Sequence, residues 1–79
     1  MNIDVKMLAD IASQARPLLE QLPKATAEKL RPVLDAIEDP ATPPSRMATL
    51  AASAQKILEG AGGSIVGAGL LALLGKLFT

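Results

Sequence analysis

The residues best suited to acid–base chemistry are three carboxylates that lie close together in the sequence. Asp35, Glu38 and Asp39 fall near the end of one predicted helix, where Asp35 and Asp39 would stand one turn apart. A general acid or base that works near neutral pH needs burial or a second charged group to shift its pKa. The surrounding sequence indicates neither, so we expect these carboxylates to lie on a solvated helix surface.

Nucleophilic and metal chemistry lack the residues that they require. The chain contains no histidine and no cysteine, so Ser45, Ser53 and Ser64 have no base to activate them. Lys56 would need a desolvated pocket that so small a fold can hardly enclose. A metal ion would depend on carboxylates alone, and no aspartate-rich loop of the calcium type is present. The sequence therefore predicts a protein that is not an enzyme and that holds no metal or cofactor.

Composition restricts the class of partner. The 79 residues carry eight basic and eight acidic side chains, and zero net charge argues against nucleic acid, which requires a positive surplus. Hydrophobic residues make up 49% of the chain, which is more than a monomer of this size easily buries. We expect the surplus to contact a second copy, a larger protein partner or a lipid. The first residues lack the apolar core of a secretory signal, which favours a cytoplasmic location.

The elements that position these residues are predicted to be helices. Residues 1–39 should form an N-terminal helical pair, because apolar residues recur at spacings of three and four. Asp4 can cap the first helix, and Pro17 should kink or break it. Thr26 can cap the second helix, which contains Pro32. Both helices are therefore expected to be amphipathic and kinked.

The C-terminal half follows a proline-rich linker at residues 40–44. Residues 45–79 begin with a helix that Thr42 or Ser45 can cap and that has the most regular apolar stripe in the sequence. Two alternatives then remain at the glycine-rich segment. Either Gly60, Gly62 and Gly63 end this helix through a left-handed cap, after which Ser64 starts a fourth helix, or the third helix continues straight through. The predicted fold is thus one small all-α domain of three to four helices.

The apolar C-terminal segment raises the question of function. From Gly60 to Gly75 the chain has no charged residue, and a helix that is apolar on nearly every side is buried in protein or in lipid. Small residues such as Gly63 and Gly67, four positions apart, allow a second backbone to come close. We therefore predict a non-catalytic interaction module that self-associates or docks on a protein partner. The residues expected to make this contact are Met47, Leu50, Ala54, Ile57, Ile65, Gly67, Leu70, Leu71, Leu74 and Phe78.

Two alternatives accompany this prediction. Residues 61–79, as one helix, would be about 28 Å long at 1.5 Å per residue, close to a hydrocarbon core of about 30 Å. Lys76 near its end could reach the membrane surface. The chain would then be a small protein of the inner membrane, either a tail-anchored subunit or a membrane-permeabilising element. The other alternative is a small structural subunit of a larger assembly.

The C-terminal half also resembles a known group of modules. Its residues are Pro43-Pro44-Ser45-Arg46, then Leu50, then Ile57 to Gly63 with the letters ILEGAGG, then Gly69-Leu70-Leu71. This pattern, over residues 43–79, is similar to helical tails and accessory modules of bacterial phage-defence and other conflict-system proteins. The resemblance implies a soluble oligomerisation or adaptor module without catalytic residues, serving as an accessory component of a defence system.

Overall fold

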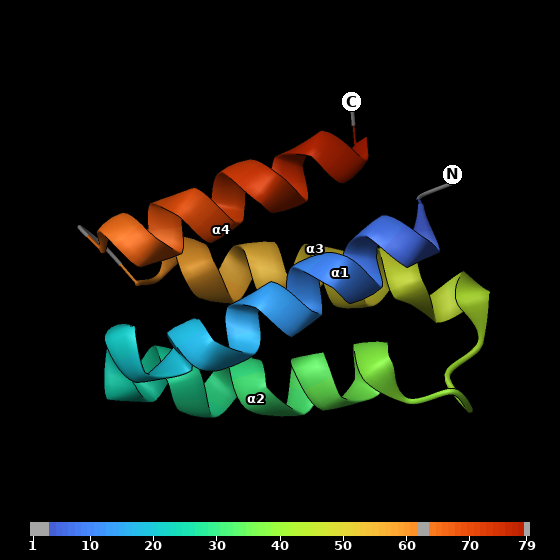
Figure 1. Cartoon of the computed structure of the whole chain (residues 1–79), viewed down its shortest axis with the longest axis horizontal. Coiled ribbons are helices and arrows are strands. Elements are labelled where there is room, and N and C mark those ends of the chain that lie inside the picture. The colour runs from blue at the N-terminus through green and yellow to red at the C-terminus, as the bar shows by residue number, and fades with distance from the viewer. Residues whose placement is uncertain (1–3, 62–63, 79) are drawn as a thin grey trace.

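The computed structural model describes residues 4–61 and 64–78, apart from the side chain of Phe78. These residues form four α-helices and two 3-10 helices, and they contain no strand (Figure 1). The elements are, in chain order, α1 (Val5–Ala15), η1 (Arg16–Gln21), α2 (Lys24–Glu38), α3 (Pro44–Glu59), α4 (Ile65–Gly75) and η2 (Lys76–Phe78). The predicted all-α class is confirmed.

The first helix begins and ends for reasons that are local in the sequence. The side chain of Asp4 accepts a hydrogen bond of 3.0 Å from the amide of Met7, which caps α1. Pro17 has no amide hydrogen to donate, so the α-helical pattern stops at Ala15 and the chain tightens into η1. The predicted cap and the predicted break at Pro17 are both confirmed.

The start of α2 differs from the prediction. The helix begins at Lys24, directly after Pro23, and no side chain caps it. Thr26 therefore lies inside the first turn, where its side chain is buried, and the predicted capping role of Thr26 is wrong. The physical reason is that Pro23, in extended backbone, already occupies the position before the first helical residue. Pro32 is accommodated inside the helix.

The start of α3 also follows from a proline. Pro43 precedes the helix in extended backbone, and Pro44 is its first residue, where a missing amide hydrogen costs no hydrogen bond. Neither Thr42 nor Ser45 caps the helix, so that prediction is wrong. The hydroxyl of Thr42 instead donates to the carbonyl oxygen of Ala36 at 2.6 Å. This bond ties the connection between α2 and α3 to the end of α2.

The glycine-rich segment separates α3 from α4, so the alternative of one continuous helix is wrong. Gly60 ends α3 with a right-handed backbone (φ −73°), and the predicted left-handed cap at this residue is also wrong. Gly62 and Gly63, the other predicted capping residues, lie outside the described residues. The hydroxyl oxygen of Ser64 accepts from the amide of Gly67 at 3.1 Å and caps α4, as predicted.

The helices surround one hydrophobic core. Figure 1 shows α2 and α4 on opposite sides of the pair formed by α1 and α3. The buried apolar side chains of the core are Leu8, Ile11, Ala12, Ala15, Leu19, Leu22, Ala27, Leu30, Leu34, Ile37, Met47, Ala51, Ala54, Leu58, Leu70, Leu74 and Leu77. The cavity among them holds about 10 Å³, which is too small for anything larger than one water molecule. The core of the described residues therefore offers no internal ligand site.

Candidate interaction surface on the fourth helix

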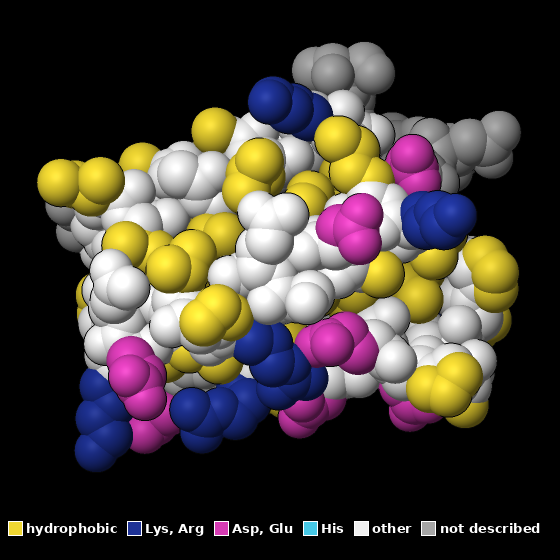
Figure 2. All heavy atoms as spheres, viewed as in Figure 1, with side chains coloured by type: hydrophobic (Ala, Val, Ile, Leu, Met, Phe, Trp, Pro, Cys, Tyr) yellow, Lys and Arg dark blue, Asp and Glu magenta, His cyan; other side chains and the backbone are white. Residues whose placement is uncertain are grey.

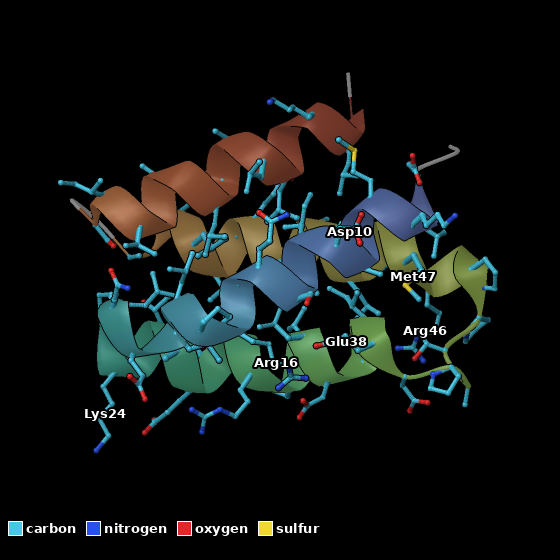
Figure 3. All side chains as sticks on the ribbon, viewed as in Figure 1. Asp10, Arg16, Lys24, Glu38, Arg46 and Met47 are labelled. Atoms are coloured by element: carbon cyan, nitrogen blue, oxygen red, sulfur yellow. The ribbon has the colours of Figure 1, made fainter. Side chains whose placement is uncertain are left out.

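The carboxylates with the spacing for acid–base chemistry are engaged in structural contacts. The guanidinium of Arg16 donates to Asp35 at 2.5 Å and to Glu38 at 2.6 Å, and so joins η1 to α2 (Figure 3). Hydrogen bonds from Arg16 to Asp35 and Glu38 raise the pKa of the arginine above its ordinary value. Asp39 accepts from the amide of Ala41 at 2.8 Å and closes the turn after α2. Within the described part of the chain, no three acidic residues are grouped so as to hold a metal ion.

The inner face of α4 completes the core. Leu70 and Leu74 are 2% and 3% exposed, and Leu77 of η2 is buried beside them. Val66, Leu71 and Leu73 are partly buried and pack against the same cluster. Most of the large apolar side chains of α4 are therefore covered by α1 and α3 of the same chain.

Gly67 is also turned inward. A Cβ atom at this position would lie 3.3 Å from the Cβ of Ala61 and 3.4 Å from the Cβ of Ser64. Both neighbours belong to the turn that leads into α4. The missing side chain at Gly67 thus lets the chain fold back tightly onto its own turn.

The outer face of α4 carries a different set of residues. Ile65, Ala68, Gly69, Ala72 and Lys76 are exposed and fall on one side of the helix at spacings of one, three and four. Ile65 is 89% exposed, far more than Val5 and Met7, the other large exposed hydrophobic residues of the described chain. A Cβ atom at Gly69 would meet nothing within 4 Å. We call Ile65, Ala68, Gly69 and Ala72 the outer face of α4.

A groove lies beside Ile65. One wall comes from the connection between η1 and α2, with Gln21, Leu22 and Pro23. The other wall comes from Ala61 and from the start of α4, with Ser64, Ile65 and Val66. The groove is open to solvent, measures about 780 Å³ and contains no charged side chain in its lining. It is large enough to accept a side chain from another molecule.

Charge is distributed unevenly around the molecule. In Figure 2, lysine and arginine side chains gather along the lower edge, over α2, with acidic side chains among them, whereas the upper edge, over α4, is mostly hydrophobic and has a basic side chain towards its C-terminal end. The sequence of α4 contains no charged residue, whereas α2 contains six. The outer face of α4 is thus apolar, and Lys76 of η2 lies one turn beyond its last residue, Ala72.

The structure divides the ten residues that the sequence predicted as contacts. Five of them are buried in this chain's own fold, namely Met47, Ala54, Gly67, Leu70 and Leu74. Three are partly buried, namely Leu50, Ile57 and Leu71. Ile65 is exposed, and the side chain of Phe78 lies outside the described structure. Leu70 and Leu74 therefore pack against α1 and α3 of the same chain, and Ile65 is the one of the ten whose side chain is exposed in the described structure.

Ala72 and the far wall of the groove were not among the residues that the sequence indicated. Ala68 and Ala72 are four positions apart, and Gly69 stands next to Ala68, so together they mark the side of α4 opposite Leu70 and Leu74. That spacing alone does not tell which side of an apolar helix faces the core. Nothing in the sequence indicated Gln21 and Pro23, because only the folded chain brings η1 close to the start of α4.

Among the described residues, no helix has both the length and the hydropathy of a membrane span. Comparison of the chain with protein-family models, with curated proteins and with solved structures gives no match.

Proposed function

We propose that this protein is a non-catalytic interaction module that binds another protein surface through the outer face of α4. The observation that carries the proposal is the 89% exposure of Ile65 on a helix without charged residues. Covering a large aliphatic side chain contributes about 1.5–3 kcal/mol. Because Ile65 is exposed in the isolated chain, its burial against a partner would add this amount to the free energy of binding.

The other side chains of the face support a protein partner. Ala68, Gly69 and Ala72 project little from the helix, so a second backbone can pack closely against them. A lipid surface would favour several bulky apolar side chains, and Ile65 is the one large apolar side chain on the outer face of α4, with Lys76 as the basic residue one turn beyond Ala72. The resemblance of residues 43–79 to accessory tails of phage-defence proteins agrees with such a module, and a role as an accessory component there is part of this proposal.

Site-directed photo-crosslinking in cells that express the chain tests the proposal. A photoreactive amino acid is placed at Ala68 or Ala72, and at Glu28 on α2 as the matched exposed control. We expect discrete protein adducts from the two α4 positions and much weaker ones from position 28. Equal labelling from both helices, or no adduct from α4, would show that this face makes no specific protein contact.

A further inference from the structure

We infer that the partner of the outer face of α4 is a second copy of this chain, related by a two-fold axis, with Ile65 of each copy seated in the groove of the other. This inference rests on the proposed function, because it names the partner of the same surface.

The first reason is that a protruding side chain and a groove lie next to each other. Ile65 is 89% exposed, and the groove formed with Gln21 and Pro23 opens beside it. In a two-fold pair the same patch of both copies faces itself, so each contact that one copy makes is returned by the other. A patch that holds both an apolar projection, Ile65, and a recess lined by uncharged side chains meets this requirement.

The second reason is charge. Neither α4 nor the lining of the groove contains a charged side chain, and Lys76, the next charge on this side, lies one turn beyond Ala72 in η2, outside the patch. The whole chain has a formal net charge of zero at pH 7, which removes long-range repulsion between copies as well. A strongly charged partner would gain no ion pairs from this patch and would lose hydration on binding.

The third reason is the profile of the helix beyond Ile65. Ala68, Gly69 and Ala72 continue the exposed face along α4, and the space around Gly69 is empty to at least 4 Å. Two α4 helices that cross at these residues can therefore approach closely. Ile65 of each copy, one turn before the crossing, then contacts the groove of the other copy.

The surface area available for contact limits the affinity of the dimer. The molecule measures 31 × 25 × 17 Å, and Figure 1 shows α4 along one long edge. An edge of 31 by 17 Å has an area of about 530 Å², which is below the roughly 800 Å² per partner of a stable complex. The expected dimer is therefore weak, with a dissociation constant in the micromolar range or above.

Sedimentation of the purified full chain tests this inference. From low micromolar to about 1 mM protein, the apparent mass should rise from 8.2 kDa towards twice that value. Ile65→Lys should weaken the association at least about tenfold, because each dimer loses the contact twice. Val5→Lys is the matched control, since it places the same charge on a partly exposed aliphatic residue of α1 and should leave the dissociation constant unchanged.

A mixing experiment tests whether Ile65 of one copy contacts the groove of the other copy. Gln21→Glu places a carboxylate in the groove, and it should weaken the homodimer on its own. A mixture of Ile65→Lys and Gln21→Glu copies should form the mixed dimer in preference to either homodimer, because the introduced ammonium group then meets the introduced carboxylate only across the interface. Native mass spectrometry counts the three species. Both positions are exposed, and circular dichroism should show that both variants keep the helical fold.

Three outcomes would overturn the inference. One is a chain that stays at 8.2 kDa throughout the concentration series. Another is a dimer that Ile65→Lys and Val5→Lys weaken equally, and the last is sedimentation with neutral phosphatidylcholine vesicles in place of dimerisation. A single-copy chain that still gives α4 crosslinks to a different protein would overturn the second copy as partner and leave the proposed function standing. Absence of any crosslink from α4 would defeat both.

Discussion

Truncation of Leu70 is the sharpest test of how α4 is used. Leu70 is 2% exposed and lies in the core, whereas Ile65, five positions earlier on the same helix, is 89% exposed. Leu70→Ala and Ile65→Ala remove comparable aliphatic groups from one helix. The two variants therefore compare a residue of α4 that packs in the core with a residue of α4 that is exposed to solvent.

The magnitude follows from burial. Leu→Ala in a packed core costs about 2–5 kcal/mol, and a residual cavity pushes the cost upward. Leu70 borders the existing core cavity of about 10 Å³ together with Leu8 and Leu74, so the deleted atoms enlarge that space. We expect a loss of about 3 kcal/mol. A chain of 79 residues has a total stability of roughly 8 kcal/mol, so this is a large fraction of the whole.

Ile65→Ala should change the stability by no more than about 0.5 kcal/mol, as surface substitutions usually do. The better helix propensity of alanine can even give a slight gain. The assay is urea unfolding followed by far-ultraviolet circular dichroism, because the chain has no tryptophan or tyrosine to supply intrinsic fluorescence. Low protein concentration keeps any association from adding to the measured stability.

Two results would refute the reasoning. If Leu70→Ala cost less than about 1 kcal/mol, α4 would not be packed into the core as described. If Ile65→Ala destabilised the dilute chain as much as Leu70→Ala, the exposed face would be part of the fold rather than a free surface. In either case the proposal that the outer face of α4 is a free interaction surface would be wrong.

Other positions give further tests by the same unfolding assay. Gly69→Ala should stabilise the chain by up to about 1 kcal/mol, because its Cβ meets nothing; Gly67→Ala should gain less, because its Cβ lies 3.3 Å from that of Ala61. Equal gains at the two glycines would contradict the described packing. Ser64→Ala should cost about 1 kcal/mol by removing the cap of α4. Thr42→Val should cost about 1 kcal/mol by deleting its bond to a backbone carbonyl, and an unchanged midpoint would speak against that bond.

The helical class could be predicted because its signals are local. Asp4 caps the amide three residues later, and Pro17 removes a hydrogen bond within its own turn. The starts of α2 and α3 were missed because the sequence offered hydroxyl caps, Thr26 and Thr42, close to prolines that begin a helix unaided. When a hydroxyl residue and a proline within a few residues both favour a helix start, the sequence alone does not show which of them begins the helix.

The candidate site could be predicted only in part. Every side of α4 is apolar, so periodicity does not tell which side faces the core. Leu70 and Leu74 were expected to meet a partner, and they pack on α1 and α3 instead, because large side chains bury more area there than Ala68 or Ala72 would. Ile65 was one of the residues predicted to contact a partner, and its 89% exposure could not be predicted, because it depends on how α4 is placed on the rest of the chain.

The placement of α2 and α4 on opposite sides of the molecule limits how far assembly can proceed (Figure 1). A pair joined through α4 covers Ile65 and the groove of both copies, and in the described part of the chain the other large exposed hydrophobic side chains, Val5 and Met7, are only 37% and 36% exposed. Its outward surfaces are then the two α2 helices, on which acidic and basic side chains are mixed. Such a complex is finite, whereas the same projection and recess on opposite ends of the chain would polymerise it into a filament.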